Sequence, residues 1–499
     1  MGACAVSAGC GAPAGSGDTD PAALAPTDAP LYGEIVVDPE GEQEEAVDAL
    51  LARFPELGDP AERIPELIDE AFAEQDSSLT YSEDIEPWLG DRIGLFVSGY
   101  SGGEEADGAL VVATTDEETA RSALEQDLNE AEQRSYDGVD YLYDPEDDAV
   151  AGIVDGFLVA GSEPGFQAAV DAAAGEGLVD SERFSAALDQ AEGDPLATLY
   201  FDTAAFVDIA AESDPTFDAQ AGALFQAISP SDPTVATLTA EEDALVIDSS
   251  QSGLPVSTLG AGAAIVSELP DDAWLAFGAP EVGDTASEVL DALEEGGGPS
   301  RDTIASGLEA QTGLDLDRDL LGWMGDLGVF VRGTALLDLG GAVVIETTDP
   351  AASGRALQAV ERLLRADGEV TVGAPSVGGI DEGFSATGPG APQAVQVVQA
   401  DGRVVAAYGE PATTDGLDPQ RTLADDPEFT AAAERLGNDY ELSTFVEVAP
   451  IIELASNFGA ESDPGFTEAK PYLERFSHIA AGTREEGDSL ITRTRIELE

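Results

Sequence analysis

The chain contains the same ordered set of sequence elements twice, and this repetition limits the folds that it can adopt. Four stretches of the first half recur in the second half in the same order. The clearest matches are Gly108–Asp116 with Gly341–Asp349, and Ala236–Ile247 with Ala481–Thr492. Repetition at a fixed spacing is typical of equivalent folded units. We therefore expect two tandem homologous units that fold alike.

The repeat also predicts where the units begin and end. A chain of 499 residues exceeds the size at which a single hydrophobic core stops growing, so more than one domain is expected. The residues Ser-Ser-Gln-Ser-Gly-Leu-Pro, which begin at Ser249, are typical of a linker. We predict a disordered tether over residues 1–28, repeat unit 1 over 29–250, a linker over 251–268 and repeat unit 2 over 269–499.

Apolar runs and turn residues predict the elements of one unit. We expect strands at Leu31–Val37, Ile93–Val97, Ala109–Ala113 and Thr198–Phe201, helices at Glu42–Phe54, Glu117–Glu132 and Glu182–Leu188, and hairpins over Val150–Ala160 and Ala236–Ile247. Hairpins mixed with single helices predict a mainly antiparallel sheet that is covered by helices on one face. The predicted fold class is α+β.

A large acidic surplus determines the conditions in which such a chain can be compact. The sequence has 101 Asp and Glu residues against 20 Lys and Arg residues, a net charge of −81, and Lys470 is its single lysine. This charge opposes compaction in dilute buffer, but near molar salt the Debye length falls to about 3 Å. We therefore expect an acidic protein of a halophilic organism. The alternative is that the carboxylates bind a cationic partner or calcium. The charge argues against nucleic acid and anionic membrane surfaces as partners.

Residues for common catalytic and metal sites are scarce. The two cysteines, Cys4 and Cys10, lie in the first ten residues, and the single histidine is His478. Histidine-based triads and histidine-rich metal centres are thus nearly excluded. His478 has apolar neighbours in Phe476–Ile479, so we predict a packed or surface histidine and not a catalyst. We predict no cofactor and no metal.

The first 28 residues indicate a possible lipid anchor. Small residues precede Cys4 and Cys10, and a stretch rich in Gly, Ala, Pro and Asp follows, as in a processed lipoprotein. Neither cysteine follows the basic start and apolar core of a complete signal peptide, so either the true start codon lies upstream or these are ordinary small residues. No apolar run is long enough for a transmembrane helix. We expect an extracytoplasmic, cell-surface or membrane-tethered protein that contacts the membrane only through this possible lipid anchor.

One short motif, Trp-[Leu/Met]-Gly-Asp, occurs once in each unit. Its residues are Trp88, Gly90 and Asp91 in the first unit and Trp323, Gly325 and Asp326 in the second. We predict a structural role, in which tryptophan packs on the sheet, glycine forms a tight turn and aspartate caps it. A ligand platform is the functional alternative. Asp315–Asp319 also resembles a calcium loop, but it lacks the required glycine and the final glutamate.

The order of these features resembles one known family. The Pro-x-Asp-Ala opening, the Trp-Leu-Gly strand entry, the Thr-Thr-Asp helix start and the Asp-Gly hairpin follow one another as in the bacterial domain-of-unknown-function family 3352. The resemblance covers the chain from about Ala25 to the C-terminus. It implies an exported or membrane-anchored protein without an assigned activity, and it supplies no catalytic residues.

These observations favour a non-enzymatic, surface-tethered envelope protein that binds an unknown protein or a small-molecule ligand. Clefts between domains are favoured binding places, so we expect the ligand between the two units. Two alternatives remain. A carboxylate-based hydrolase of cell-envelope glycans would need two carboxyl groups about 5–10 Å apart in a groove. A carrier of apolar cargo would need a large apolar cavity between sheet and helices.

Overall fold

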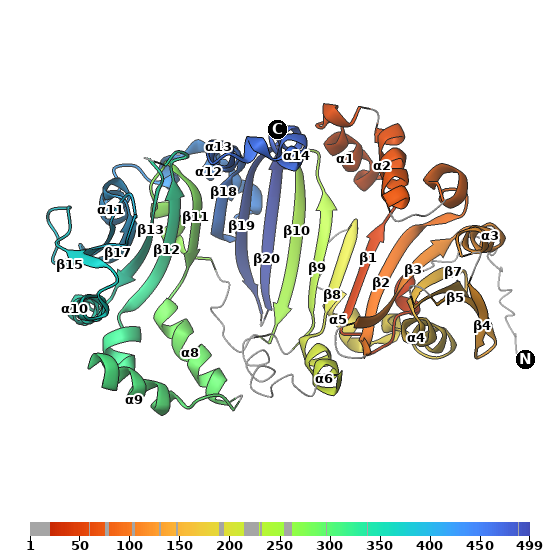
Figure 1. The fold of residues 1–499 in the computed structure, drawn as a ribbon, viewed down its shortest axis with the longest axis horizontal. Helices are drawn as coiled ribbons and strands as arrows, with labels where there is room; N and C mark the ends of the chain where they lie inside the picture. Colours follow the sequence, from red (N-terminus) through yellow and green to blue (C-terminus); the bar gives the residue numbers. More distant parts are fainter. Residues whose placement is uncertain are drawn as a thin grey trace, which may run out of the picture.

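One antiparallel sheet of 20 strands runs through the molecule in the computed structural model (Figure 1). The structure describes residues 20–58, 60–74, 79–101, 105–128, 131–145, 148–188, 194–213, 229, 232–253, 262–295, 297–336, 338–487 and 489–499. Residues 1–19 of the predicted tether, including Cys4 and Cys10, lie outside the described residues. Residues 20–28 are described: Pro21–Ala23 form a 3-10 helix, and Ala22, Leu24 and Ala25 are at most 2% exposed. This part therefore packs in the core of the first unit and is not a disordered tether. No helix among the described residues is long and apolar enough to cross a membrane.

The first unit supplies ten strands and the second unit supplies the other ten. The first ten are β1 (Leu31–Val36), β2 (Leu89–Ser101), β3 (Glu105–Thr114), β4 (Glu132–Tyr136), β5 (Val139–Asp144), β6 (Ala149–Val154), β7 (Phe157–Ser162), β8 (Ala197–Phe201), β9 (Thr234–Ala240) and β10 (Ala244–Ser252). The others are β11 (Ala273–Ala279), β12 (Met324–Arg332), β13 (Gly340–Thr347), β14 (Thr371–Gly373), β15 (Glu382–Thr387), β16 (Val395–Ala400), β17 (Arg403–Tyr408), β18 (Glu441–Glu447), β19 (Phe476–Glu486) and β20 (Ser489–Leu498).

Helices fill the connections between these strands. The first unit has α1 (Glu42–Leu51), α2 (Pro60–Glu74), α3 (Glu117–Asp127), α4 (Glu163–Ala174), α5 (Glu182–Leu188) and α6 (Thr203–Ser213). The second unit has α8 (Val282–Glu295), α9 (Arg301–Thr312), α10 (Pro350–Asp367), α11 (Glu410–Leu417), α12 (Pro427–Leu436), α13 (Val448–Asn457) and α14 (Pro464–Leu473). The predicted α+β class with a large antiparallel sheet is confirmed.

The strand order is the same in both units. It runs β4-β5-β6-β7-β3-β2-β1-β8-β9-β10 in the first unit and β14-β15-β16-β17-β13-β12-β11-β18-β19-β20 in the second. The first strand of each unit lies in the interior of the sheet: β1 lies between β2 and β8, and β11 lies between β12 and β18. Every one of these pairings is antiparallel, so each strand position in one unit has a counterpart in the other.

The two units join along their last strands, β10 and β20. Ala244–Ser252 pairs with Ser489–Glu497 over nine residues. The predicted linker over 251–268 therefore begins inside β10, and it ends in a 3-10 helix, Ala264–Glu268, in which Ile265 and Val266 are buried. Residues 254–261 of this linker lie outside the described residues.

Asp248 lies directly opposite Arg493. The two residues are also counterparts in the repeat, because Asp248 pairs with Thr237 of β9 and Arg493 pairs with Gly482 of β19. Thr237 and Gly482 hold the same position in the matching stretches that begin at Ala236 and Ala481. A local twofold axis therefore passes between Asp248 and Arg493. The units meet edge to edge as continuous sheet, and not as separate lobes around an open cleft. Beside the seam, a pocket of about 960 Å³ is lined by first-unit residues, among them Glu241 and Asp248, and by Arg493 of the second unit.

Ion pairs reinforce this seam between β10 and β20. Arg493 binds Asp248 with both ends of its guanidinium group, Nε to Oδ1 at 2.8 Å and Nη2 to Oδ2 at 2.9 Å. Arg495 makes a second two-point contact with Glu241, at 2.8 Å for each bond, and also contacts Glu497 at 3.0 Å. Two-point contacts of this kind fix the relative orientation of the paired groups, and hence the register of the two strands.

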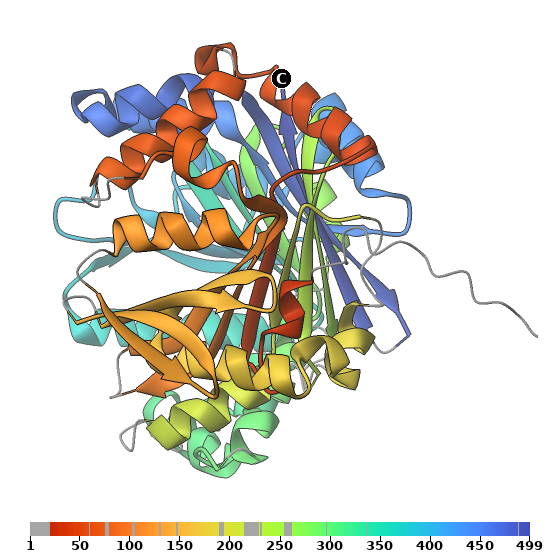
Figure 2. The ribbon, with the colours of Figure 1, turned by 90° about the vertical axis from the view of Figure 1, so that its right-hand side faces the viewer.

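Helices cover both faces of the sheet, which corrects the prediction of a single covered face (Figure 2). In the first unit, Val111 and Val159 pack under α4 and α5, whereas Val112 and Leu158 pack under α3. Neighbouring residues of a strand point to opposite faces, so α3 and α4 lie on opposite sides. The second unit repeats this arrangement, with α11 and α12 on one face and α10 on the other. We call the side of α3 and α10 the front face and the side of α4 and α11 the back face.

The seam generates a stability prediction. Substituting Arg493→Asp places two carboxylates opposite each other and removes both bonds to Asp248, so we expect a loss of about 2 kcal/mol in the free energy of unfolding. Urea unfolding in near-molar salt measures it. The charge-exchanged double variant, Asp248→Arg with Arg493→Asp, should recover most of the loss. Equal unfolding midpoints for Arg493→Asp and the wild type would contradict a role for this pair.

Candidate functional site

The repeated tryptophans are held in the same way in both units. Trp88 and Trp323 are each 3% exposed, and each follows a π-helical turn, Tyr81–Ile85 or Leu316–Leu321. The indole nitrogen donates to a main-chain oxygen inside that turn, which is the oxygen of Asp84 at 2.5 Å or of Asp319 at 3.2 Å. Because the rings are buried against the sheet and bonded within the turn, they offer no open surface to a ligand.

The glycines and aspartates of the motif act differently from the predicted turn and cap. Gly90 lies within β2, where a Cβ atom would approach Ala113 of β3 to 2.8 Å, and Gly325 lies within β12. These glycines therefore permit close approach of the neighbouring strand. Asp91 is largely exposed, whereas Asp326 accepts a hydrogen bond from the main-chain nitrogen of Glu281 at 3.0 Å.

Other carboxylates, those of Asp84 and Asp319, hold the π-helical turns. Asp84 accepts hydrogen bonds from the main-chain nitrogen of Thr80 at 2.8 Å and from the Thr80 hydroxyl at 3.1 Å. Asp319 accepts the equivalent main-chain bond from Asp315 at 3.1 Å. Sequence comparison of the repeats contained this signal, since an aspartate precedes each tryptophan by four residues.

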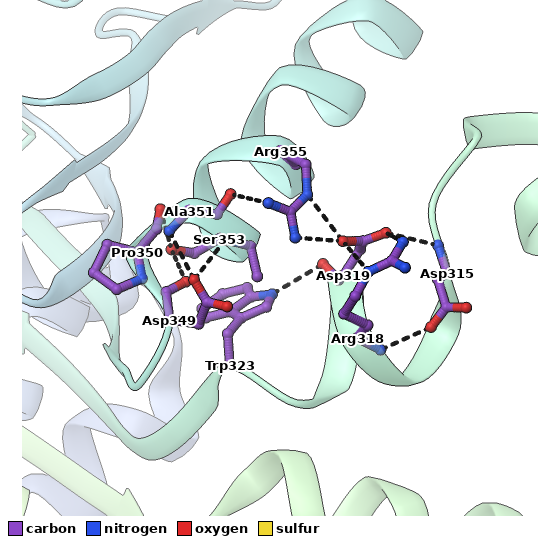
Figure 3. A network of polar contacts seen from close by, with 10 residues as sticks. Asp315, Arg318, Asp319, Trp323, Asp349, Pro350, Ala351, Ser353 and Arg355 are labelled. Atoms are coloured by element: carbon purple, nitrogen blue, oxygen red, sulfur yellow. Dashed lines mark hydrogen bonds and ion pairs between the residues drawn. The ribbon is translucent and has the colours of Figure 1, made fainter.

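In the second unit, Asp319 is also the centre of an arginine network (Figure 3). Its side chain is 3% exposed and binds Arg318 through Nη2 at 2.6 Å and Arg355 of α10 through Nη2 at 2.6 Å and Nε at 2.9 Å. These guanidinium groups hold the pKa of Asp319 well below its ordinary value. The network ties α10 to the turn that precedes β12. Asp319 thus binds protein groups, and no cluster of three potential metal ligands occurs in the described part of the chain.

The single histidine lies in the sheet close to its end. His478 is 6% exposed, and its ring lies 5.8 Å from that of Phe445. Its Nδ1 atom lies 3.1 Å from the hydroxyl of Ser477. Burial lowers the pKa of His478, so its neutral form is favoured.

An apolar groove lies on the front face of the first unit, in the strands β3, β2, β1, β8, β9 and β10. It has a volume of about 450 Å³. Fourteen residues line it, and ten of them alternate toward this face: Gly33, Ile35, Ile93, Leu95, Leu110, Ala197, Leu199, Ala236, Leu238 and Ile247. The other four, Glu34, Gly94, Thr198 and Thr237, form the row between them, whose side chains point to the back face. The ten occupy two neighbouring rows of the ladder, in which Leu110 is opposite Leu95, Leu95 opposite Gly33, and Gly33 opposite Leu199.

Large side chains of this groove are open to solvent. Ile35 and Leu199 are each 48% exposed, Leu95 is 47% exposed and Leu110 is 40% exposed. Isolated exposed apolar side chains are common, but contiguous ones mark binding surfaces. Three helices lie beside the groove: α3 packs on Val112 and Leu158, α1 packs near Ala240, and α6 packs at the other end of the strands. The ring of Phe206 in α6 lies 5.6 Å from that of Phe201 in β8.

Glu34 of β1 and Arg92 of β2 carry their charged groups on the opposite side of the sheet. Glu34, the charged residue of β1, accepts a hydrogen bond from the hydroxyl of buried Tyr32 at 2.6 Å and one from Arg92 at 2.5 Å. Tyr32 belongs to the back-face core, so this polar cluster lies behind the strand. Each of the ten side chains that face the groove is aliphatic or glycine.

Comparison with known proteins identifies a family. The family model described as "Protein of unknown function (DUF3352)" matches residues 3–499. The chain therefore belongs to this family, and the resemblance noted in the sequence is confirmed. No curated protein shows significant similarity to it. Two solved structures, titled "Structure of crystal form I of TP0453" and "Structure of crystal form III of TP0453", are 12% and 13% identical. Each match covers 47% of this chain. The matches cover 79% and 80% of the two solved chains, and their TM-scores are 0.24 and 0.25.

The Asp319 network generates a prediction about acid stability. The depressed pKa means that the stabilisation by these ion pairs is fully present above the ordinary carboxyl pKa of about 3.9, and is lost progressively as the pH falls from there toward the lower pKa of the folded state. Substituting Asp319→Asn should cost about 2 kcal/mol at neutral pH. It should also remove the corresponding part of the wild-type acid sensitivity.

Thermal unfolding between neutral pH and pH 3 measures both effects. Asp84→Asn is the matched control, because Asp84 holds the same kind of turn through Thr80 without the two arginines. Its cost at neutral pH should be smaller. Equal costs for the two variants would show that the arginine network adds nothing to stability.

Proposed function

We propose that this member of the DUF3352 family is a non-enzymatic binding protein of the cell envelope, and that its first unit binds an aliphatic chain in the front-face groove. The observation that carries the proposal is the groove itself. Ten aliphatic or glycine positions form one open surface on a chain whose net charge is −81. A volume of about 450 Å³ lies within the range of small-molecule sites, about 300–1,000 Å³.

The polar groups of the groove favour a hydrocarbon over a peptide. The main-chain groups of β1 are shared with β2 on one side and β8 on the other, so they are already paired. An extended peptide would lose its own hydrogen bonds to water without replacement, and each buried unpaired group costs about 1–3 kcal/mol. A hydrocarbon chain has no such groups, and its burial is favourable by about 25 cal/mol per Å² of apolar surface.

The charge of the protein restricts the polar end of the ligand. An anionic head group would approach a molecule with a net charge of −81, whereas a neutral or cationic head group would not be repelled. High salt weakens this repulsion, and salts that are excluded from protein surfaces strengthen apolar contacts. A neutral or cationic amphiphile of one alkyl chain is the ligand class that fits both properties.

The alternative of a carboxylate-based hydrolase receives less support from this groove. Glycoside hydrolysis uses two carboxyl groups that flank the bond to be cleaved. The ten side chains that face the groove carry no ionisable group. The groove therefore favours binding over catalysis, and the apolar-cargo alternative becomes part of the main proposal.

The two units are proposed to be homologous copies that arose by duplication of one domain. Their identical strand orders support this origin. The seam supports it as well, because a ladder in which counterparts pair symmetrically, as Asp248 and Arg493 do, is the pairing of a twofold dimer. Fusion of such a dimer would give the present chain.

The proposed location is the cell surface, with a lipid on Cys4 or Cys10. Small residues before each cysteine and the tether-like composition after them support the proposal. A tether of this kind would leave the sheet and its groove free above the membrane. The net charge and near absence of lysine support a high-salt environment.

Ligand binding is tested with N-phenyl-1-naphthylamine, a neutral apolar fluorophore, and with unlabelled long-chain alcohol as competitor, in near-molar salt. The wild type should bind the fluorophore and release it to the alcohol. Leu199→Glu places a charge in the groove and should weaken binding at least about tenfold, or about 1.4 kcal/mol.

Leu67→Glu is the matched control for this experiment. Leu67 lies on α2 and is 41% exposed, close to the 48% of Leu199, but it does not line the groove. Its affinity should equal that of the wild type. Equal weakening by both substitutions, or no displaceable fluorophore in the wild type, would refute the groove as the binding site.

Metabolic labelling with a radioactive fatty acid tests the anchor. We expect label on the protein made from its native gene, and loss of that label in either Cys4→Ser or Cys10→Ser. The variant that keeps its label serves as the control for expression and export. An unlabelled native protein would remove the lipid anchor from the proposal without affecting the groove.

A further inference from the structure

We infer that Gly33 and its counterpart Phe277 decide which unit binds the aliphatic chain, so that one chain of the protein takes one ligand. This inference rests on the proposed function of the groove. Gly33 lies in β1 and Phe277 lies in β11, and each occupies the interior strand of its unit. They are the smallest and one of the largest residues at one structural position.

The strand registers establish that the two positions are equivalent. Gly33 lies opposite Leu95 of β2 and Leu199 of β8. Phe277 lies opposite Val329 of β12 and Thr444 of β18. Because β1 and β11 have corresponding neighbours in the strand order, residue 33 of one unit and residue 277 of the other project from the same place on the sheet.

The missing side chain of Gly33 leaves the floor of the groove open. A Cβ atom placed on Gly33 would find its nearest neighbour, Cδ1 of Leu199, at 3.9 Å, so the space above the residue is free. Gly33 does not need the conformational freedom of glycine, since it lies in a regular strand and has no positive φ angle. The glycine is therefore not explained by the backbone, whereas space for a ligand explains it.

Phe277 fills the same place in the second unit. The residues on either side of it, Ala276 and Gly278, are buried on the back face, while Phe277 is 40% exposed on the front face. Val343, the counterpart of Leu110, is 36% exposed beside it. The second unit thus keeps an apolar front face, but an aromatic ring stands where the ligand chain would lie.

A further difference makes the second unit a poorer site for hydrocarbon. Thr444 occupies the position of Leu199 and brings a hydroxyl group to the front face. Burying a hydroxyl without a partner is unfavourable, so an aliphatic chain gains less there than against leucine. The ring of Phe277 and the hydroxyl of Thr444 both direct the ligand to the first unit.

Exchange of the two residues tests the inference. The full-length protein is titrated with N-phenyl-1-naphthylamine in near-molar salt, and the number of sites is read from a continuous-variation plot. We expect one site in the wild type, none in Gly33→Phe, two in Phe277→Gly and one in the double variant. The absence of a site in Gly33→Phe means that the affinity of the first unit falls at least about tenfold, below detection at the concentrations that saturate the wild type.

Folding is controlled independently of binding. Circular dichroism and the unfolding midpoint are measured for each variant, and Phe277→Ala replaces Phe277→Gly if glycine destabilises β11. Wild-type binding in Gly33→Phe, or one site in Phe277→Gly and Phe277→Ala together with none in the double variant, would overturn the inference and leave the proposed function intact. No site in the wild type would refute the proposed function itself.

Discussion

The pairing of β10 with β20 is the interaction on which the architecture depends. Without it the molecule would be two ten-stranded sheets, each with an open edge of nine residues. With it, the front faces of both units become one surface, and the groove has a fixed position relative to the second unit. Two-point ion pairs lie at the axis and beside it, where they set the register of the ladder. Basic residues are few in a chain with a net charge of −81, and the presence of Arg493 and Arg495 at this seam indicates that the pairing of the two strands depends on them.

Local sequence signals predicted the parts of the fold that depend on neighbouring residues. The hairpin of β6 and β7 follows from Asp155-Gly156, which have positive φ angles of 45° and 87°. The helix α3 begins at the predicted Glu117, after Asp116 accepts hydrogen bonds from the main-chain nitrogens of Glu118 and Thr119, but it ends at Asp127 and not at the predicted Glu132, which begins β4. The helices on the second face were missed, although the unbroken apolar run Ala109–Ala113 carries the signal of a strand buried on both sides.

Long-range features were beyond the sequence. The ladder of β10 and β20 joins residues about half the chain apart, and no local pattern specifies a partner at that distance. The groove is a related case. The apolar run Ile93–Val97 in β2 predicts a strand that is covered on both faces. In the structure, however, Ile93 and Leu95 line the groove on the front face, which is open to solvent. Repetition located the tryptophan motif and also contained its anchoring carboxylates, Asp84 and Asp319, but only their hydrogen bonds in the structure show that they hold the turns.

The negative charge of the protein allows the apolar groove to stay exposed to solvent. A surface crowded with carboxylates keeps the molecule hydrated and apart from its copies, and it can therefore carry an uncharged strip without association. Behind the groove, on the back face of the same strands, the charged groups of Glu34 and Arg92 are paired with each other. The front face of these strands thus offers an apolar surface, while these charged groups lie on the back face.

The order of the strands has a further consequence for the two outer edges of the sheet. Joining the long edges of both units leaves β4 and β14 outermost. β14 has only three residues, and β4 carries Glu132 and Arg134 among its five. Short or charged edges are poor templates for further strand addition. A sheet of this width therefore ends in two protected edges, which guard it against fibrous growth.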